Sequence, residues 1–185
     1  SDPARNFAVT WDPTPASGWA NTQLLFVCSP GNPTGAVMPL SEWQKLFELS
    51  DRYGFIIASD ECYSEIYFRD EPPLGGLEAA VKLGRTDFKN LVMFTSLSKR
   101  SNVPGMRSPV VQAASVAAWH DEAHVVDNRA QYRAKFAQVT PVLASVLDVA
   151  LPDASFYLWA GVPAAWGGCD TDFARELLAQ YNVTV

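Results

Sequence analysis

The sequence predicts an α/β fold in which a mainly parallel sheet is covered by helices and is followed by part of a smaller α+β unit. Three observations support this class. Short continuous apolar runs recur with the length of strands that are buried on both faces. A helical period separates the first two runs, which gives the strand–helix–strand order of a right-handed parallel crossover. Beyond the third run, helices and then a short meander replace this order. The three runs are residues 23–28, 55–59 and 91–94.

The helix between the first two runs has recognisable ends. Ser41 is followed three residues later by Gln44, which is the spacing of a capping box and predicts the N-terminus of the helix. Apolar side chains recur at helical spacing up to Tyr53, and Gly54 predicts the C-terminal end. A shorter helix is expected at residues 77–83, after a loop rich in proline and glycine.

The second half of the chain is predicted to be mainly helical. Pro141 should begin a new turn or a kink in the longest helix. The expected elements are helices 110–119, 121–147 and 170–180, and strands 149–151, 156–159 and 182–185. The change of pattern divides the chain into a partial large domain, residues 1–130, and a long interdomain helix with the start of a small C-terminal domain, residues 131–185.

Composition argues against several classes of function. The net charge of −6 and the pI near 4.8 disfavour nucleic acid as a partner. No apolar run is long enough to span a membrane and no signal peptide opens the chain, so we expect a cytoplasmic protein. Cys28, Cys62 and Cys169 are far apart and show no pairing pattern. Cys28 and Cys62 lie in apolar, strand-like surroundings, which favours buried thiols in a reducing compartment over a disulfide or a metal site. His120 and His124 lack the adjacent glutamate of a zinc-protease helix, so we expect them on a solvated helix face and predict no metal.

The polar loops that follow the three apolar runs form the candidate site, because ligands bind at the carboxyl ends of parallel strands. The first loop, residues 29–35, holds two prolines and two glycines, and the second run leads into Asp60. Lys99 follows the third run, where partial desolvation should lower the pKa of its amine and make it a usable nucleophile. Ser96 and Arg107 flank it and suit a phosphate. This set points to a pyridoxal-phosphate enzyme, and the alternative is a basic surface loop.

Three motifs together resemble the fold-type-I pyridoxal-phosphate aminotransferases. They are Ser-Pro-Gly-Asn-Pro-Thr-Gly at residues 29–35, Asp60 with Tyr63, and the set Ser96, Lys99 and Arg107. The sequence from Ser96 to Ser108 is most similar to the succinyldiaminopimelate aminotransferases of bacterial lysine biosynthesis. The resemblance covers nearly the whole chain from residue 23 onward. It implies the pyridoxal-phosphate-dependent transferase fold and pyridoxal 5'-phosphate as cofactor.

The resemblance implies a role for each residue near the cofactor ring. Lys99 would hold the cofactor covalently and then carry a proton between substrate and cofactor. Asp60 would pair with the pyridine nitrogen, although in isolation it could cap a turn or helix. Asn32 and Tyr63 would hydrogen-bond the phenolic oxygen, whereas taken alone they are a turn asparagine and a packed aromatic residue.

The resemblance also implies a phosphate anchor made of Ser96 and Arg107, with Ser98 as a further helper. The peptide bond before Pro33 is expected to be cis, as it often is in this family. One departure concerns the segment that follows the anchor. The family continues after Ser108 with a glycine, a strand and a helix, whereas here Ser108 joins Pro109 directly. We therefore expect an apparent gap at 108/109.

The implied reaction is transamination between glutamate and N-succinyl-2-amino-6-oxopimelate in the diaminopimelate route to lysine. Expected partners are amino-acid and 2-oxo-acid substrates and a second copy of the chain in a homodimer. Family members are longer, with an N-terminal phosphate loop and a C-terminal arginine for the substrate carboxylate, so we expect an incomplete chain that is inactive alone. The alternatives are another class I/II aminotransferase, a β-elimination lyase that uses the same lysine, aspartate and tyrosine, and a non-enzymatic cofactor-binding regulatory domain.

Overall fold

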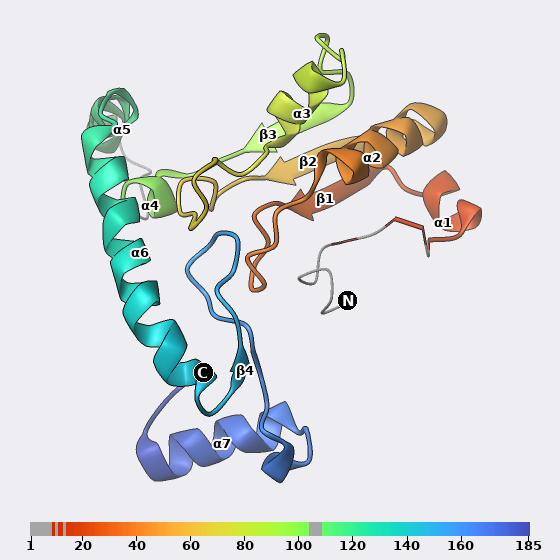
Figure 1. Ribbon diagram of the computed structural model, residues 1–185. Helices are drawn as coiled ribbons and strands as arrows, with labels where there is room; N and C mark the ends of the chain where they lie inside the picture. The colour runs from red at the N-terminus through yellow and green to blue at the C-terminus, as the bar shows by residue number, and fades with distance from the viewer. Residues whose placement is uncertain (1–8, 10, 13, 104–108) are drawn as a thin grey trace.

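The computed structural model describes residues 9, 11–12, 14–103 and 109–185. None of the helices in these ranges is long and apolar enough to cross a membrane. The elements, shown in Figure 1, are α1 (Ala16–Ala20), β1 (Leu24–Cys28), α2 (Leu40–Tyr53), β2 (Ile56–Asp60), α3 (Gly76–Lys82), β3 (Leu91–Phe94), α4 (Leu97–Arg100), α5 (Pro109–His120), α6 (Ala123–Ala144), β4 (Asp148–Val149), β5 (Ala160–Gly161), the 3-10 helix η2 (Ala164–Trp166) and α7 (Asp170–Tyr181).

Strands β1, β2 and β3 form a parallel sheet in that order (Figure 1). Cys28 at the end of β1 lies opposite Asp60 at the end of β2, and Asp60 lies opposite Phe94 at the end of β3. The carboxyl ends of all three strands therefore meet at one edge of the sheet. The order β1–α2–β2 confirms the predicted parallel α/β architecture.

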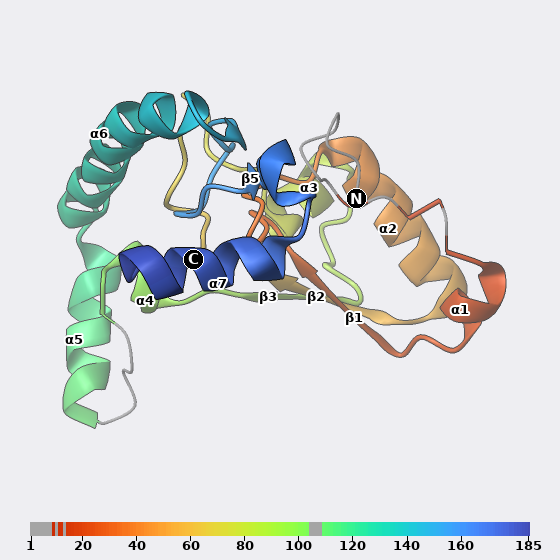
Figure 2. The same cartoon turned by 90° about the horizontal axis from the view of Figure 1, so that it is seen from below.

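Helices α2 and α3 lie on one face of the sheet (Figure 2). Trp43, Leu46 and Phe47 of α2 pack with Phe55 and Ile57, and all five side chains are at most 2% exposed. Full burial of a side chain of this size stabilises the folded state by about 1.5–3 kcal/mol. This layer, which we call the covered face, therefore supplies the main core of the first half of the chain.

The other face of the same sheet carries apolar side chains that remain exposed to solvent. We call it the open face, and its large exposed members are Leu24, Phe26, Ile56, Val92 and Phe94. Phe26 is 68% exposed. Successive side chains of a strand point to opposite faces, and α2 and α3 cover only one of them. The prediction that these strands are buried on both faces is therefore wrong for the part of the chain that the structure describes.

Helix α2 ends as predicted but begins differently. Gly54 adopts the left-handed conformation at the C-terminus with φ of 81°, and its N–H donates to the carbonyl of Ser50. The N-cap is Pro39 rather than Ser41, and no side chain caps the helix there. Gln44 donates to Glu48 instead of closing a capping box. The fixed φ of Pro39 suits the residue that enters a helix, which explains the earlier start.

The second half is helical and then irregular. Helices form close to the three predicted positions, and Pro141 lies inside α6 near its C-terminal end. Strands β4 and β5 pair antiparallel through Asp148 with Gly161 and Val149 with Ala160. The predicted strand at 156–159 is wrong, because the pairing partner of β4 begins later. The predicted strand at 182–185 is also wrong, since irregular chain follows α7.

Residues 152–157, which we call the arm, pack back onto the first half of the chain. The N–H of Ala154 donates to the carbonyl of Gly35 at 3.2 Å, and that of Ser155 donates to the carbonyl of Ile66 at 2.8 Å. Ala154 also forms an isolated antiparallel bridge with Tyr67. Ser155 adopts a positive φ of 76°, which turns the chain at this contact. These long-range bonds attach the arm to the loop after β1 and to the segment after β2.

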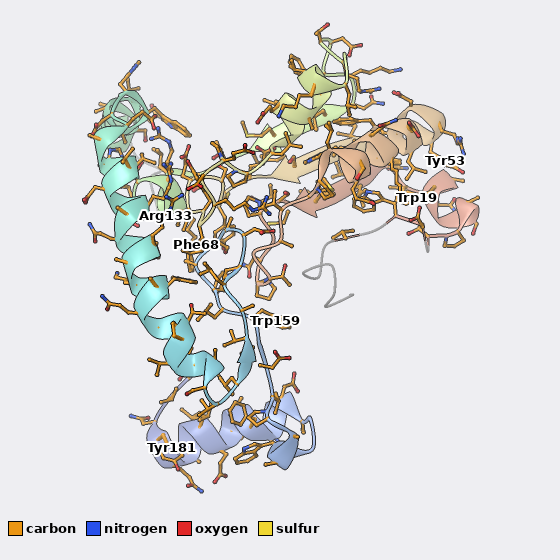
Figure 3. The ribbon with its side chains drawn as sticks, viewed as in Figure 1. Trp19, Tyr53, Phe68, Arg133, Trp159 and Tyr181 are labelled. Atoms are coloured by element: carbon orange, nitrogen blue, oxygen red, sulfur yellow. The ribbon has the colours of Figure 1, made fainter. Side chains whose placement is uncertain are left out.

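Helix α6 holds the segment after β2. In Figure 3, the labelled side chains of Phe68 and Arg133 lie where this segment meets α6. Arg133 donates from Nε to the carbonyl oxygen of Tyr67 at 3.0 Å. The rings of Phe68 and Phe136 lie 4.4 Å apart. The long helix therefore contacts chain that follows the second strand of the sheet, far away in the sequence.

Candidate active site

The carboxyl edge of the sheet brings three loops together. The N–H of Ser29, at the start of the first loop, donates to the carbonyl of Asp60 at 3.1 Å. The N–H of Glu61, at the start of the second loop, donates to the carbonyl of Phe94 at 2.8 Å. The segment after β3 leads directly into α4, which carries Lys99. The loops that hold the predicted site residues therefore share one edge.

Helix α4 is set by its own first residues. Ser96 is the N-cap, and its Oγ accepts the N–H of Ser98 at 3.1 Å. The Ser96 hydroxyl also donates to the Ser98 Oγ at 2.9 Å. Leu97 is buried, whereas both serines and Lys99 are half-buried. The two serine side chains are therefore partly accessible to solvent at the start of the helix that carries Lys99, and hydroxyls are groups that suit a phosphate.

Lys99 and Tyr63 meet across an aromatic ring of the arm. The Lys99 Nζ lies 5.1 Å from the centroid of the Phe156 ring, within cation–π range. The same ring lies 5.4 Å from that of Tyr63. The Asn32 Nδ2 donates to the Tyr63 hydroxyl oxygen at 3.2 Å. Burial, followed by a hydrogen bond with Tyr157, raises the pKa of Tyr63 above its ordinary value.

The charges of Asp60 and Lys99 have opposite effects on the pKa of the Cys62 thiol. The N–H of Cys62 donates to the Asp60 Oδ1 at 3.1 Å. Burial raises the pKa of the Cys62 thiol to about 12, and a hydrogen bond with Asp60 and its negative charge add to this. The positive charge of Lys99 acts in the opposite direction. A carboxylate and an amine from separate strand ends therefore lie within electrostatic reach of one thiol.

The first loop has the backbone that its sequence predicted. The Asn32–Pro33 peptide bond is cis, as expected, and the Ser29–Pro30 bond is cis as well. Gly35 has a positive φ of 69°, and a Cβ at this position would lie 2.3 Å from the carbonyl oxygen of Ala154. Glycine is therefore required where the arm lies against this loop.

Three side chains near the site were missed by sequence reasoning. Phe156 and Tyr157 come from the arm, which is remote in sequence, and no local pattern could have placed them. Cys28 lies opposite Asp60 on the neighbouring strand. The prediction of buried thiols is wrong for Cys28, which is exposed, and for Cys62, which is half-buried. Cys28 is exposed because it belongs to the open face of the sheet, and Cys62 lies in the turn that follows β2.

Some predicted features lie outside the described residues or differ from expectation. Arg107 lies outside the described residues, and so does Ser108, the first residue of the expected gap at 108/109. His124 was expected on a solvated face. Instead, its Nδ1 lies 2.8 Å from the Asp121 carboxylate and its Nε2 lies 2.9 Å from the Ser101 Oγ. The histidine therefore joins the end of α4 to the start of α6.

Comparison with known proteins identifies the family. The family model described as aminotransferase class I and II matches residues 8–109, which is more than half of the chain. The chain belongs to this family of enzymes.

Two relatives show how far the similarity extends. An LL-diaminopimelate aminotransferase of Nitratidesulfovibrio vulgaris is 29% identical over 94% of this chain and 50% of its own length. The crystal structure of an aminotransferase from Neisseria meningitidis matches with a TM-score of 0.88 and 50% identity, covering 95% of this chain and 50% of that chain. The chain therefore spans about half the length of the relatives that it matches.

Two more distant structures show the same fold. An N-succinyldiaminopimelate aminotransferase from Mycobacterium tuberculosis is 22% identical with a TM-score of 0.76, covering 89% of this chain and 49% of that one. A PLP-bound C-S lyase from Staphylococcus hominis is 16% identical with a TM-score of 0.70, covering 89% and 48%. The predicted transferase fold is confirmed, and the family indicates pyridoxal phosphate as the cofactor.

The donor set at the sheet edge fits this cofactor. An amine, a carboxylate, a phenol paired with an amide, and two hydroxyls at a helix start match an aldehyde, a pyridine nitrogen, a phenolic oxygen and a phosphate. These groups belong to Lys99, Asp60, Tyr63 with Asn32, and Ser96 with Ser98.

Proposed function

We propose that this chain is the cofactor-binding part of a pyridoxal-phosphate-dependent aminotransferase. The observation that carries the proposal is geometric: the ends of β1, β2 and β3 share one edge of the sheet, where Asp60 ends β2 and Lys99 follows β3 on α4. Tyr63, at the same edge, accepts a hydrogen bond from Asn32 and packs on the ring that Lys99 contacts. Family membership supports the same reaction class. Residues 1–130 would form the partial large domain, and residues 131–185 would form the interdomain helix and the start of the small domain.

Each site residue has a task that follows from its chemistry. When bound, the cofactor supplies an electron sink for the carbanion at the substrate Cα. The Lys99 amine would bind the cofactor and, once free, would carry the proton between the substrate Cα and the cofactor. The Asp60 carboxylate would hold the proton of the pyridine nitrogen, and the Tyr63 hydroxyl and Asn32 amide would donate to the phenolic oxygen. Ser96 and Ser98 bind the phosphate, a task that we also assign to Arg107.

Glutamate is the proposed amino donor and N-succinyl-2-amino-6-oxopimelate the proposed acceptor. The sequence from Ser96 to Ser108 and the diaminopimelate aminotransferases among the relatives support this choice. We further propose a cytoplasmic homodimer for the complete enzyme. The apolar open face supports the view that further polypeptide completes the fold, so the 185 residues alone would not turn over substrate.

A β-elimination lyase is the second candidate, because a C-S lyase shares the fold. Lyase chemistry would use Lys99, Asp60 and Tyr63 in the same positions. An assay of the complete enzyme separates the two reactions. Transfer of the amino group from glutamate to an added 2-oxo acid supports the aminotransferase, whereas release of pyruvate and ammonia from a cysteine conjugate supports the lyase.

Cofactor attachment to Lys99 tests the proposal directly. Pyridoxal 5'-phosphate added to the chain should give a visible absorbance band, and borohydride reduction should fix its mass on the peptide that contains Lys99. Lys99→Ala should lose both signals. The matched control is Lys89→Ala, which removes an exposed lysine in the turn before β3 and should keep both. Labelling spread over several lysines, with no preference for Lys99, would contradict the assignment.

A further inference from the structure

The helix that carries Lys99 is too short to hold its own position. Helix α4 spans only Leu97–Arg100. A single helical turn is unstable alone, because nucleation fixes several residues for one hydrogen bond. The direction of the Lys99 amine therefore depends on what α4 contacts.

A buried cation directly after Lys99 anchors α4 to the helices that follow. The Arg100 side chain is only 4% exposed. Its Nη1 donates to the carbonyl of Ala118 in α5 at 2.8 Å, and its guanidinium lies 4.6 Å from the Trp119 ring centroid. Its Nη2 forms an ion pair with Glu122, the N-cap residue of α6. Arg100 thus joins α4 to both helices.

The residues around Arg100 make further bonds to the first turns of α6. The Ser101 Oγ lies 2.9 Å from the His124 Nε2. The Asn128 Nδ2 donates to the Lys99 carbonyl at 3.5 Å. Lys99, Arg100 and Ser101 therefore each contact α6 or its cap. The start of this long helix is the surface on which the Lys99 helix rests.

Glu65 brings the other side of the site to the same place. It follows Tyr63 by two residues, and its Oε1 lies 3.9 Å from the Arg100 Nε. Its Oε2 accepts from the Arg129 Nη2 of α6 at 2.7 Å, and its carbonyl accepts from the Arg129 Nε at 2.8 Å. One carboxylate therefore lies between a cation of α4 and a cation of α6. The Glu65 carboxylate joins the segment after β2, which carries Tyr63, to α4, which carries Lys99.

We propose that the Arg100–Glu65–Arg129 bridge positions Lys99 relative to Asp60 and Tyr63. The inference rests on the proposed function, and it adds three positioning residues that do not themselves touch the cofactor. The Arg100 side chain is buried and that of Glu65 is 31% exposed, so the ion pair contributes little net stability, because desolvation of Arg100 offsets the attraction. The value of the bridge is geometric: Arg129 makes two directed hydrogen bonds to Glu65, through Nε and Nη2, and this fork fixes the Glu65 carboxylate 3.9 Å from the Arg100 Nε. If the bridge is loosened, a smaller fraction of molecules holds Lys99 in the orientation that binds the cofactor. The apparent affinity for the cofactor then falls in proportion to that fraction.

Two variants of the bridge test this role. Glu65→Gln keeps the shape and removes the charge, and Arg100→Met keeps much of the volume and removes the fork. Each should weaken apparent affinity for pyridoxal 5'-phosphate by about tenfold or more, measured by absorbance titration. Arg100→Lys should restore part of the loss, because it keeps the charge. In the cofactor-free chain, both variants should speed hydrogen exchange of the Ser101 and Val103 amides, which donate to Leu97.

Arg85→Met is the matched control. Arg85 donates from Nη2 to the Asp51 carboxylate at 3.0 Å and lies 5.0 Å from the Phe47 ring centroid, away from the sheet edge that carries Lys99. It should lower stability without changing cofactor affinity or exchange near α4. The bridge is refuted if Glu65→Gln and Arg100→Met match this control in both readouts. If the unaltered chain binds no cofactor, the proposed function fails, and hydrogen exchange alone then decides whether the bridge holds α4.

Discussion

The two faces of the parallel sheet are equally apolar in sequence and opposite in environment. Ile57 lies under α2 and is fully buried, whereas Ile56, one residue earlier, lies on the open face and is 44% exposed. Two adjacent residues at the carboxyl end of β2 differ in the same way. Glu61 is buried beside α3, whereas Asp60 lies in register with Cys28 and Phe94 of the open face. One face holds the fold together, and the other carries the aspartate of the candidate site.

The comparison teaches that an apolar run shows which residues can be buried but not which face has a partner. Parallel sheets are normally covered on both sides. The exposed set Leu24, Phe26, Ile56, Val92 and Phe94 thus marks a face of the sheet that none of the described elements covers. The site edge is therefore supported by the covered face, by the arm and by α6.

The largest expected effect comes from the two adjacent isoleucines. Ile57→Ala should lower the free energy of unfolding by about 2–5 kcal/mol, because it opens a cavity in the core. Ile56→Ala removes the same atoms from a solvated position and should cost about 1 kcal/mol or less. Urea denaturation followed by circular dichroism measures both values. Equal losses at the two positions would show that another layer covers the open face, for instance through self-association.

The sequence allowed the local part of the site to be predicted and left out the long-range part. Lys99, Asp60 and Tyr63 could be assigned because each lies in a motif attached to a strand end, and parallel strands bring these ends together. Phe156 could not be assigned, since its place depends on the arm returning across the molecule. The contact of Glu65 with Arg100 likewise joins elements that no spacing rule connects.

A glycine pair sharpens the comparison at the site edge. Gly35 and Gly54 both have positive φ, but a Cβ would meet the arm at Gly35 and nothing within 4 Å at Gly54. Gly54→Ala should cost only the backbone penalty, about 1–2 kcal/mol. Gly35→Ala should cost more, because the new methyl group displaces the arm from the loop that carries Asn32. Thermal or urea unfolding gives the difference, and cofactor titration should show weaker binding for Gly35→Ala alone. A similar cost for both variants would mean that the arm does not rest on Gly35.

The smallest effect concerns Glu61, which lies on the covered side next to Asp60. Its Oε1 accepts the N–H of Gly76 at 2.7 Å and the Ser59 hydroxyl at 2.8 Å. Burial is the largest influence and raises the pKa of Glu61 above its ordinary value of 4.5, against the opposing effect of these hydrogen bonds. Between the unfolded and the raised folded pKa, the native state binds more protons than the unfolded state. The contribution of Glu61 to the free energy of unfolding is therefore fully present below about pH 4.5, and it is lost as pH rises through the folded pKa.

Glu61→Gln removes this titration while keeping an oxygen that can accept from Gly76. The stability of the variant relative to the parent chain should therefore increase from about pH 4.5 upward and become constant above the folded pKa of Glu61. Urea denaturation at a series of pH values measures the difference. Glu71→Gln, in the exposed loop before α3, controls for the loss of one negative charge. A relative stability that falls as pH rises would mean that hydrogen bonds, rather than burial, dominate at Glu61, and the covered face would then favour its charged form.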